Sequence, residues 1–284
     1  MKNFIFVFAF VFAIVGVCDS SFAQAPDSDL KWHRWTTDNF VILSIDKEQG
    51  DYLFNNIEDI KETSVSKWGI KNSVFDNRCK IIVVKDKELF EKMFRIDETR
   101  VEIRKNSDES SQAIIWCLID GSSIDIPVSV AVSEAHFASQ KDYGCFWASK
   151  GMSLLAQSLS DIKAGAKRVN GFIVEDKPMY FGKSIFNINR AQYKKLSVEH
   201  KQLFDDESVL LCLMLRKEFG QVKFLSFIEE AGRGDIEKSL KEVFGFNDFS
   251  DFDVSFKTYM NDVSRDVLND KTPDSYLGIK AVSQ

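Results

Sequence analysis

The chain has 284 residues, a net charge of −6 and 44% hydrophobic residues, among them 25 phenylalanines. This length and apolar content are enough for a substantial core, which excludes an intrinsically disordered protein. Positive and negative residues are interspersed without a basic stripe, and this argues against nucleic acid as a partner.

The first 25 residues have the pattern of a secretory signal peptide. Lys2 precedes an apolar run from Phe4 to Val17, and Ala23-Gln24-Ala25 forms a small-residue cleavage site. Val17 is a poor match to the small residue that a lipoprotein signal needs before Cys18, so simple cleavage is preferred to lipidation. The run is shorter than the roughly 20 residues that span a bilayer, and no other segment comes closer. We therefore expect an exported protein, periplasmic or secreted, with no membrane span after cleavage.

Residues 26–126 are expected to form a small mixed sheet with helices. Their start, 26–38, is predicted to be a loop that Trp32 and Trp35 fasten to the body. The charged run 95–111 is predicted to be either an exposed loop or an edge element. Apolar runs and helical periodicity predict a strand at 40–45, a helix at 53–68 closed by Gly69, a strand at 80–84, a helix at 89–94, a strand at 113–119 and a turn at 120–123.

Two helices joined by a short turn follow, and the rest of the chain is organised around them. The first is expected to begin at Pro127, which fits the first turn of a helix, and to end before Gly144. The second is marked by apolar residues three and four positions apart from Trp147 to Ile162. Both are expected to be largely buried.

The last third reads as a series of helices. Asp205 and Asp206 are predicted to cap a central apolar helix that ends at Gly220. Further helices are expected at 222–231, from Asp235 to Gly245, and over 252–263. Residues 163–190 lack a clear period and are predicted to be an irregular connection, and 269–284 a flexible tail. The predicted fold class is therefore α+β, with a sheet subdomain at 26–126 and a helical subdomain at 127–268.

The four cysteines after the signal peptide leave the disulfide pairing open. Export permits disulfides, but no spacing indicates a pair or a zinc ribbon. Cys79 and Cys117 fall in strand-like runs that can be neighbours, whereas Cys212 lies in so apolar a helix that a buried free thiol is expected. Cys145 has no histidine placed to activate it, so a catalytic thiol is not favoured.

The two organising helices resemble the metal-site helices of gluzincin peptidases, the peptidase MA-like branch of the zincins. In that family a His-Glu-x-x-His helix supplies two zinc ligands and a general base, and a Trp-Leu-x-Glu-Gly-x-Ala helix supplies the third ligand. The matching segments here are Ser133-Glu134-Ala135-His136-Phe137 and Trp147-Ala148-Ser149-Lys150-Gly151-Met152-Ser153. The resemblance implies a zincin-like fold, and it extends weakly over residues 32–265.

The residues at the three ligand positions are not zinc ligands. The base position (Glu134), the Trp and the Gly match the family, but Ser133, Phe137 and Lys150 stand where all three ligands belong. We therefore expect no metal and no cofactor. Because Lys150 replaces a ligand beside Glu134, we predict an ion pair between them that links the two helices in place of the metal; the alternative is that Lys150 reaches solvent.

His136 does not restore a site. A second ligand four positions away would have to be Val132 or Gln140, so a structural histidine is the preferred interpretation. The predicted function is a non-catalytic pseudo-metallopeptidase that binds a peptide or protein in its cleft or serves as a scaffold. One alternative is a hydrolase that uses Glu134 as acid and base, with or without a metal held by Asp142, His136 and Glu175. Another is an exported α+β binding protein of a different fold.

Overall fold

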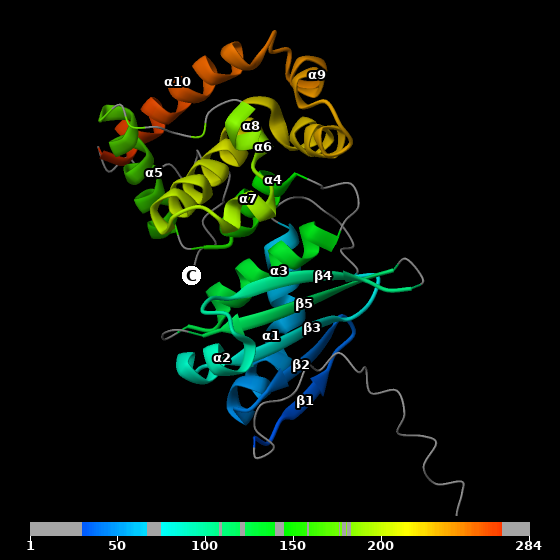
Figure 1. The fold of residues 1–284 in the computed structure, drawn as a ribbon. Coiled ribbons are helices and arrows are strands. Elements are labelled where there is room, and N and C mark those ends of the chain that lie inside the picture. Colours follow the sequence, from blue (N-terminus) through cyan, green and yellow to red (C-terminus); the bar gives the residue numbers. More distant parts are fainter. Residues whose placement is uncertain are drawn as a thin grey trace, which may run out of the picture.

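A computed structural model describes residues 30–66, 75–107, 110–119, 123–139, 145–157, 159–175, 177, 180 and 183–268. Over these residues the protein has an α+β fold, with a mixed sheet first and helices after it along the chain (Figure 1). The strands are β1 (His33–Thr36), β2 (Phe40–Ser44), β3 (Cys79–Val84), β4 (Arg100–Lys105) and β5 (Ser111–Leu118). The expected fold class is confirmed at this level.

The strands lie in the order β1-β2-β3-β5-β4. β2, β3 and β5 run parallel, whereas β1 and β4 pair antiparallel at the two edges. In β3 only Lys80 is partly exposed, as expected for a parallel strand that is covered on both faces. The three predicted strands correspond to β2, β3 and β5, with ends that differ by at most two residues.

Both edge strands are rich in polar residues, so local pattern identifies them poorly. β1 lies where a loop is predicted, and that prediction is wrong because pairing with β2 makes these 4 residues a strand. The indole of Trp35 donates to Asp51 at 2.9 Å, and its ring covers Gly50, which confirms that Trp35 fastens this segment to the body. β4 confirms the edge-element alternative for 95–111.

Helices cover both faces of the sheet. α1 (Lys47–Ser66) and α3 (Asp125–Ser139) pack together over one face, and α2 (Lys87–Phe94) lies against the other (Figure 1). Pro127 lies in the first turn of α3, as predicted. Val128, Ala131, Val132 and Ala135 of α3 belong to the apolar core beneath the sheet, so this helix is held by β-strand side chains on one side.

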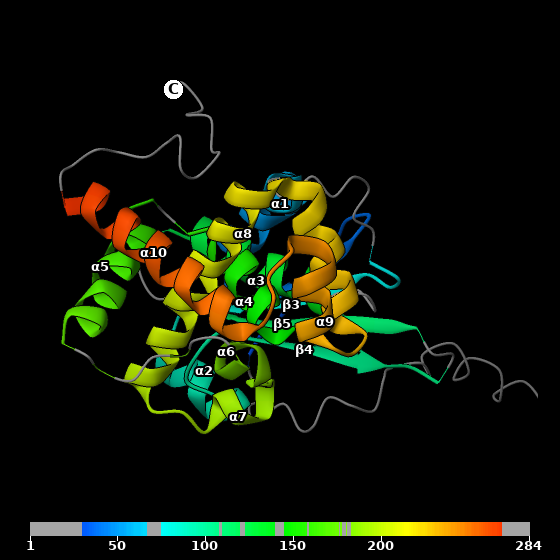
Figure 2. The same ribbon diagram turned by 90° about the horizontal axis from the view of Figure 1, so that it is seen from above.

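The helical part surrounds α8, as Figure 2 shows from above. Every residue from Val209 to Leu215 in α8 is buried, which confirms the expected central helix. A single aromatic-rich core joins this part. Its elements are α4 (Phe146–Leu154), α5 (Leu159–Val174), α6 (Lys183–Asn187), α7 (Arg190–Lys194), α8 (Val198–Gly232), α9 (Ile236–Ser239), the π-helical turn η1 (Leu240–Phe244) and α10 (Phe249–Leu268).

The second organising helix is shorter than predicted, and the segment after it is more regular. The helix ends at Leu154, and a new helix, α5, continues to Val174 through a region predicted to be irregular. Gly165 accounts for part of this wrong prediction, because a glycine often interrupts a helix but this one lies inside α5. A Cβ at Gly165 would lie 2.6 Å from the Asp206 carboxylate, so this glycine allows α5 to approach α8 and does not end a helix.

The predicted start of α8 is also wrong. Ser197 caps the helix by accepting a hydrogen bond from the His200 N–H, and Asp205 and Asp206 lie two turns inside it. Gly220 does interrupt the helix as predicted, with φ 78° and ψ 162°. Farther along, Asp235 caps α9 and Gly245 ends η1 at φ 83°, both as expected.

The four cysteines from Cys79 onward are free and buried. Cys117 lies opposite Val83 on β3, four residues from Cys79, so the two strand cysteines lie on neighbouring strands without facing each other. The expected buried free thiol at Cys212 is confirmed, and burial raises the pKa of this thiol well above its ordinary value.

Within the described residues, no helix is both long and apolar enough to cross a membrane. The predicted signal peptide, the predicted tail at 269–284 and the predicted helix stops Gly69 and Gly144 lie outside the described residues.

Candidate functional site

Glu134 of α3 and Lys150 of α4 meet where the two helices pack. The Lys150 ammonium lies 3.8 Å from the Glu134 carboxylate, and their side chains are 17% and 14% exposed. The predicted ion pair is therefore present. The two residues lie on different helices, so spacing within a helix could not predict the pair. The matching of the two segments to one family motif predicted it.

Arg190, the first residue of α7, is a second cation on Glu134. One guanidinium nitrogen, Nη2, donates to Glu134 Oε1 at 3.0 Å, and the other, Nη1, donates to the backbone oxygen of Val101 at 2.6 Å. The guanidinium also lies 5.8 Å from the centre of the Phe146 ring. Arg190 thus connects α7 to helix α3 and to the edge strand β4.

Tyr193 and Asp205 complete the charge cluster, by which we mean Glu134, Lys150, Arg190, Tyr193 and Asp205. The Tyr193 hydroxyl donates to Asp205 Oδ2 at 2.9 Å, and the Lys150 ammonium lies 5.2 Å from the centre of the Tyr193 ring. Asp205 Oδ1 is buried, with no hydrogen-bond partner among the described residues.

Burial and charge shift the pKa values in this cluster. Burial raises the pKa of Asp205 to about 6, although Lys150 and the Tyr193 hydroxyl act in the opposite direction. Burial by itself would lower the pKa of Lys150, but nearby carboxylates, led by Glu134 and Asp205, outweigh it and hold that pKa above the ordinary value. Burial also raises the pKa of Tyr193, so its hydroxyl stays protonated and remains a donor to Asp205.

A pocket of about 250 Å³ opens beside the cluster, and we call it the Glu134 pocket. One wall comes from the chain that enters β4, and the other walls come from α3, α4 and α7. It is lined by Ile96, Asp97, Glu98, Thr99, Arg100, Val101, Glu134, Phe146, Lys150, Arg190, Tyr193 and Lys194. The pocket therefore joins the cluster to one free edge of the sheet.

The other residues of the resembling motif do not line this pocket. Ser133, Phe137 and Trp147 are fully buried. A Cβ at Gly151 would meet the Ser208 backbone oxygen and lie 2.7 Å from the sulfur of Cys212, so this glycine brings α4 close to α8. These four residues act in packing, and neither Ser133 nor Phe137 offers a ligand to the pocket.

His136 lies on the other side of α3, in an aromatic environment. It is 1% exposed, and the rings of Phe75 and Phe137 lie 6.0 and 5.4 Å away, centre to centre. Both ring nitrogens are buried without a hydrogen-bond partner among the described residues. Burial, with a smaller effect of Lys61, lowers the pKa of His136 to about 4, so the ring is neutral at pH 7. A structural role fits these surroundings, although no described residue forms a hydrogen bond to the ring.

The alternative metal set does not come together in the described part of the chain. Glu175 pairs with Lys177 at 2.7 Å on the surface, and Asp142 lies outside the described residues. Among the described residues, no group of three or more His, Cys, Asp or Glu side chains is arranged to hold a metal ion.

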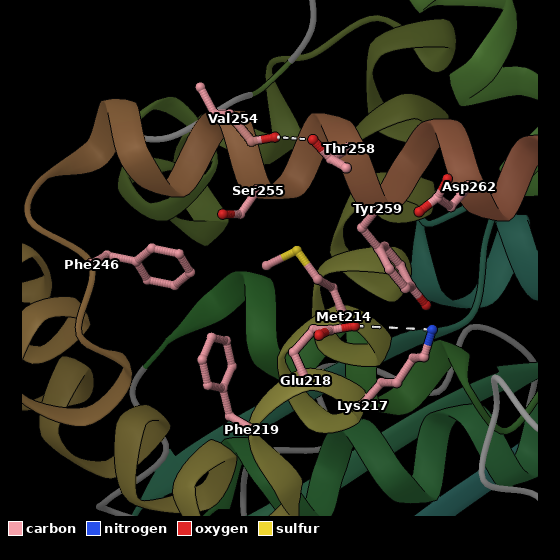
Figure 3. Close-up of a pocket in the computed structure, with 10 residues that line it drawn as sticks. All are labelled: Met214, Lys217, Glu218, Phe219, Phe246, Val254, Ser255, Thr258, Tyr259 and Asp262. Carbon is pink, nitrogen blue, oxygen red and sulfur yellow. Dashed lines mark hydrogen bonds and ion pairs between the residues drawn. The ribbon is translucent and has the colours of Figure 1, made fainter.

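A second pocket, of about 390 Å³, lies between α8 and α10 (Figure 3). The thioether of Met214 projects into it, and the rings of Phe219 and Phe246 stand on one side. On the other side the Lys217 ammonium lies 3.9 Å from Glu218 and 5.5 Å from the centre of the Tyr259 ring. Lys217 is thus engaged by Glu218 and by the Tyr259 ring at the edge of this pocket.

Sequence reasoning missed Arg190, Tyr193 and Asp205. Arg190 is the last residue of the segment predicted to be irregular, and Tyr193 lies just after it, where no element was predicted. A signal was present, because Asn189 and Gln192 form a capping box that starts α7 and places Arg190 and Tyr193 one turn apart. Asp205 was predicted to cap a helix, and that role gave no reason to expect a contact with Tyr193.

The whole chain matched no model of a known protein family, and no curated protein matched it. Function is therefore inferred from the residues around Glu134. Both oxygens of this carboxylate are engaged by cations, so it is placed to hold α3, α4 and α7 together. Arg190 Nη2 donates to Oε1 at 3.0 Å, and the Lys150 ammonium lies 3.8 Å from Oε2.

Proposed function

We propose that the protein is an exported, non-catalytic pseudo-metallopeptidase of the gluzincin type, which binds a peptide or protein in the Glu134 pocket. In this proposal the fold is zincin-like. Helix α3 takes the place of the family's metal-binding helix, and α4 takes the place of the helix that carries the third ligand.

The contact between Lys150 and Glu134 carries the proposal. The ammonium lies 3.8 Å from the carboxylate, where the resemblance would place the metal between a general base and its third ligand. The other two ligand positions hold a hydroxyl and a phenyl side chain, both turned into the core. Serine and phenylalanine are not zinc ligands, and a general base has no bound water to activate without the metal.

The edge of β4 supports binding of an extended peptide. β4 is an outer strand, and its Val101 borders the pocket. The backbone N–H of Asn106 donates to the backbone oxygen of Ser110 at 2.8 Å. In an antiparallel pair, every second residue from Asn106 therefore directs its backbone N–H and C=O groups toward β5. The residues between them, Val101, Ile103 and Lys105, direct these groups outward. A peptide can pair with such groups as an added strand.

The test begins with zinc and peptidase activity. The purified protein is incubated with equimolar zinc and desalted, and its metal content is measured by mass spectrometry together with cleavage of a pool of random eight-residue peptides. We expect far less than one zinc per chain and no cleavage. Near-stoichiometric zinc with cleavage would overturn the proposal in favour of the hydrolase alternative.

Peptide binding is then measured with the same pool by affinity capture, and dissociation constants are obtained by fluorescence anisotropy. The matched control is each captured peptide methylated on alternate backbone nitrogens. We expect methylation in one of the two registers to weaken binding at least tenfold, because it removes the N–H groups that pair with β4. Binding that is insensitive to both registers would exclude strand addition.

A further inference from the structure

The side chain of Arg190 occupies the place in the Glu134 pocket that an added peptide would need. Its Nη1 donates to the Val101 oxygen at 2.6 Å and its Nη2 to Glu134 at 3.0 Å. Val101 oxygen is an outward-facing carbonyl of the edge strand. The bond of Arg190 to the Val101 oxygen therefore takes the place of a bond from a partner's backbone N–H. Its bond to Glu134 takes the place of a bond from a partner's cation.

The charges around Arg190 favour a cation at this place. The neighbouring lining groups are the carboxylates of Asp97, Glu98 and Glu134 and the ammonium groups of Lys150 and Lys194. Without Arg190 they leave an excess of negative charge. The remaining lining cation, Arg100, lies within 4.0 Å of Glu102 and over the ring of Trp116, so it is already engaged outside the pocket.

Arg190 can leave while α7 remains in place. The side chain is 38% exposed and belongs to the first residue of the helix. Tyr193 holds α7 independently, through its bond to Asp205 at 2.9 Å and ring contacts with Phe146 and Phe204 at 5.3 and 5.5 Å. A change of side-chain rotamer is therefore enough to vacate the place beside Glu134.

We propose that the Glu134 carboxylate and the Phe146 ring form a subsite for an arginine side chain of an extended partner peptide whose backbone pairs with the Val101 oxygen, and that Arg190 occupies this place when no partner is bound. The proposal deepens the proposed function and rests on it for the peptide nature of the partner. An incoming strand supplies a backbone N–H to Val101 and a guanidinium to Glu134, so both bonds of Arg190 are replaced. Planar guanidinium groups match carboxylates and aromatic faces together.

The first test vacates the subsite. Arg190→Ala is titrated with N-acetylarginine methylamide and with the citrulline analogue, which has nearly the same shape and no charge, and binding is measured by calorimetry. We expect at least tenfold tighter binding of the arginine probe than of the citrulline probe. We also expect Arg190→Ala to bind the arginine probe at least tenfold more tightly than the unmodified protein, in which Arg190 competes.

Matched variants locate the binding. Lys195→Ala removes an exposed cation at the end of α7 that does not line the pocket, and it is expected to bind the arginine probe no better than the unmodified protein. Adding Glu134→Gln to Arg190→Ala is expected to abolish the preference for arginine over citrulline. Arg190→Gln serves as a second vacated variant, and circular dichroism confirms that each protein is folded before titration.

The outcomes separate this inference from the proposed function. Equal affinity for the two probes, or no arginine binding by either folded Arg190 variant, overturns the subsite. With the unmodified protein, the peptide acetyl-Thr-Val-Arg-Val-Thr-amide is compared with its citrulline counterpart. Arginine-selective binding supports both proposals, and equal binding of the two peptides supports only peptide binding. If neither peptide binds but the vacated variant selects arginine, the subsite stands and the peptide-binding function fails.

Discussion

Helix α3 carries a buried ionisable residue on each of two sides, and the surroundings of the two residues are opposite in character. Glu134 and His136 are two positions apart, which places them about 200° apart around the helix. Glu134 borders a pocket and has Lys150 and Arg190 as partners, whereas His136 is enclosed by phenyl rings. Paired charges are retained on the first side, and on the second side burial keeps the imidazole neutral. Of these two residues of α3, Glu134 is the one that links the helices.

The largest expected effect is the loss of the carboxylate at Glu134. Glu134→Ala leaves Lys150 and Arg190 without their shared anion in a largely buried place, and we expect it to lower the free energy of unfolding by about 3–5 kcal/mol. Urea unfolding at pH 7 measures this. The matched control is Glu102→Ala, which removes an exposed carboxylate between two arginines and should cost less than about 1 kcal/mol. Equal costs for the two variants would contradict the structural role of Glu134.

His136 should make the protein sensitive to acid. Its folded pKa of about 4 lies below the ordinary histidine pKa of 6.5, so between these values the unfolded chain binds a proton that the folded chain does not. Stability therefore falls as the pH is lowered from 6.5 to 4, by about 3.5 kcal/mol from this residue. His136→Phe should remove that dependence. Urea unfolding of both proteins across this range checks it, and unchanged acid sensitivity of the variant would refute the burial argument.

Asp205 should act in the opposite direction. Its folded pKa of about 6 lies above the ordinary aspartate pKa of 3.8, so the folded chain holds the extra proton between these values. Stability falls as the pH rises from 3.8 to 6, by about 3 kcal/mol from this residue. Asp205→Asn should therefore be the more stable protein at pH 8 and equal to the unmodified protein at pH 3.5. A variant that is less stable at pH 8 would show that the charged form of Asp205 is favoured.

The smallest expected effect tests the helix contact that positions Lys150. Gly151→Ala places a methyl group against the Ser208 backbone oxygen and the Cys212 sulfur, so overpacking should cost about 1–3 kcal/mol and move α4 away from α8. Gly171→Ala is the matched control, because no atom lies within 4 Å of its added Cβ and alanine favours helix, which predicts a gain of up to about 1 kcal/mol. Thermal unfolding distinguishes the two. Similar shifts for both variants would show that α4 tolerates displacement.

The sequence predicted two parts of the site, one from the resemblance to a known motif and one from spacing within a single helix. Matching two short segments to a known motif placed Glu134 and Lys150 together, and the ion pair is present. His136 was expected to be structural for lack of a second ligand at helical spacing, and its aromatic surroundings agree. Arg190 was not predicted, because its contact with Glu134 joins residues 56 positions apart and no local period relates them.

The same division applies to the fold. Continuous apolar runs determined β2, β3 and β5, and glycines with positive φ determined the interruption at Gly220 and the stop at Gly245, since each depends on residues adjacent in sequence. Tertiary packing decided β1, which became a strand by pairing with β2, and α5, in which Gly165 serves close approach to Asp206. It also gathered Arg190, Tyr193 and Asp205 around Glu134. Local patterns specify where the backbone forms a helix, a strand or a stop, whereas the partners of a buried charge are chosen by whichever distant segments the folded chain brings within hydrogen-bonding distance.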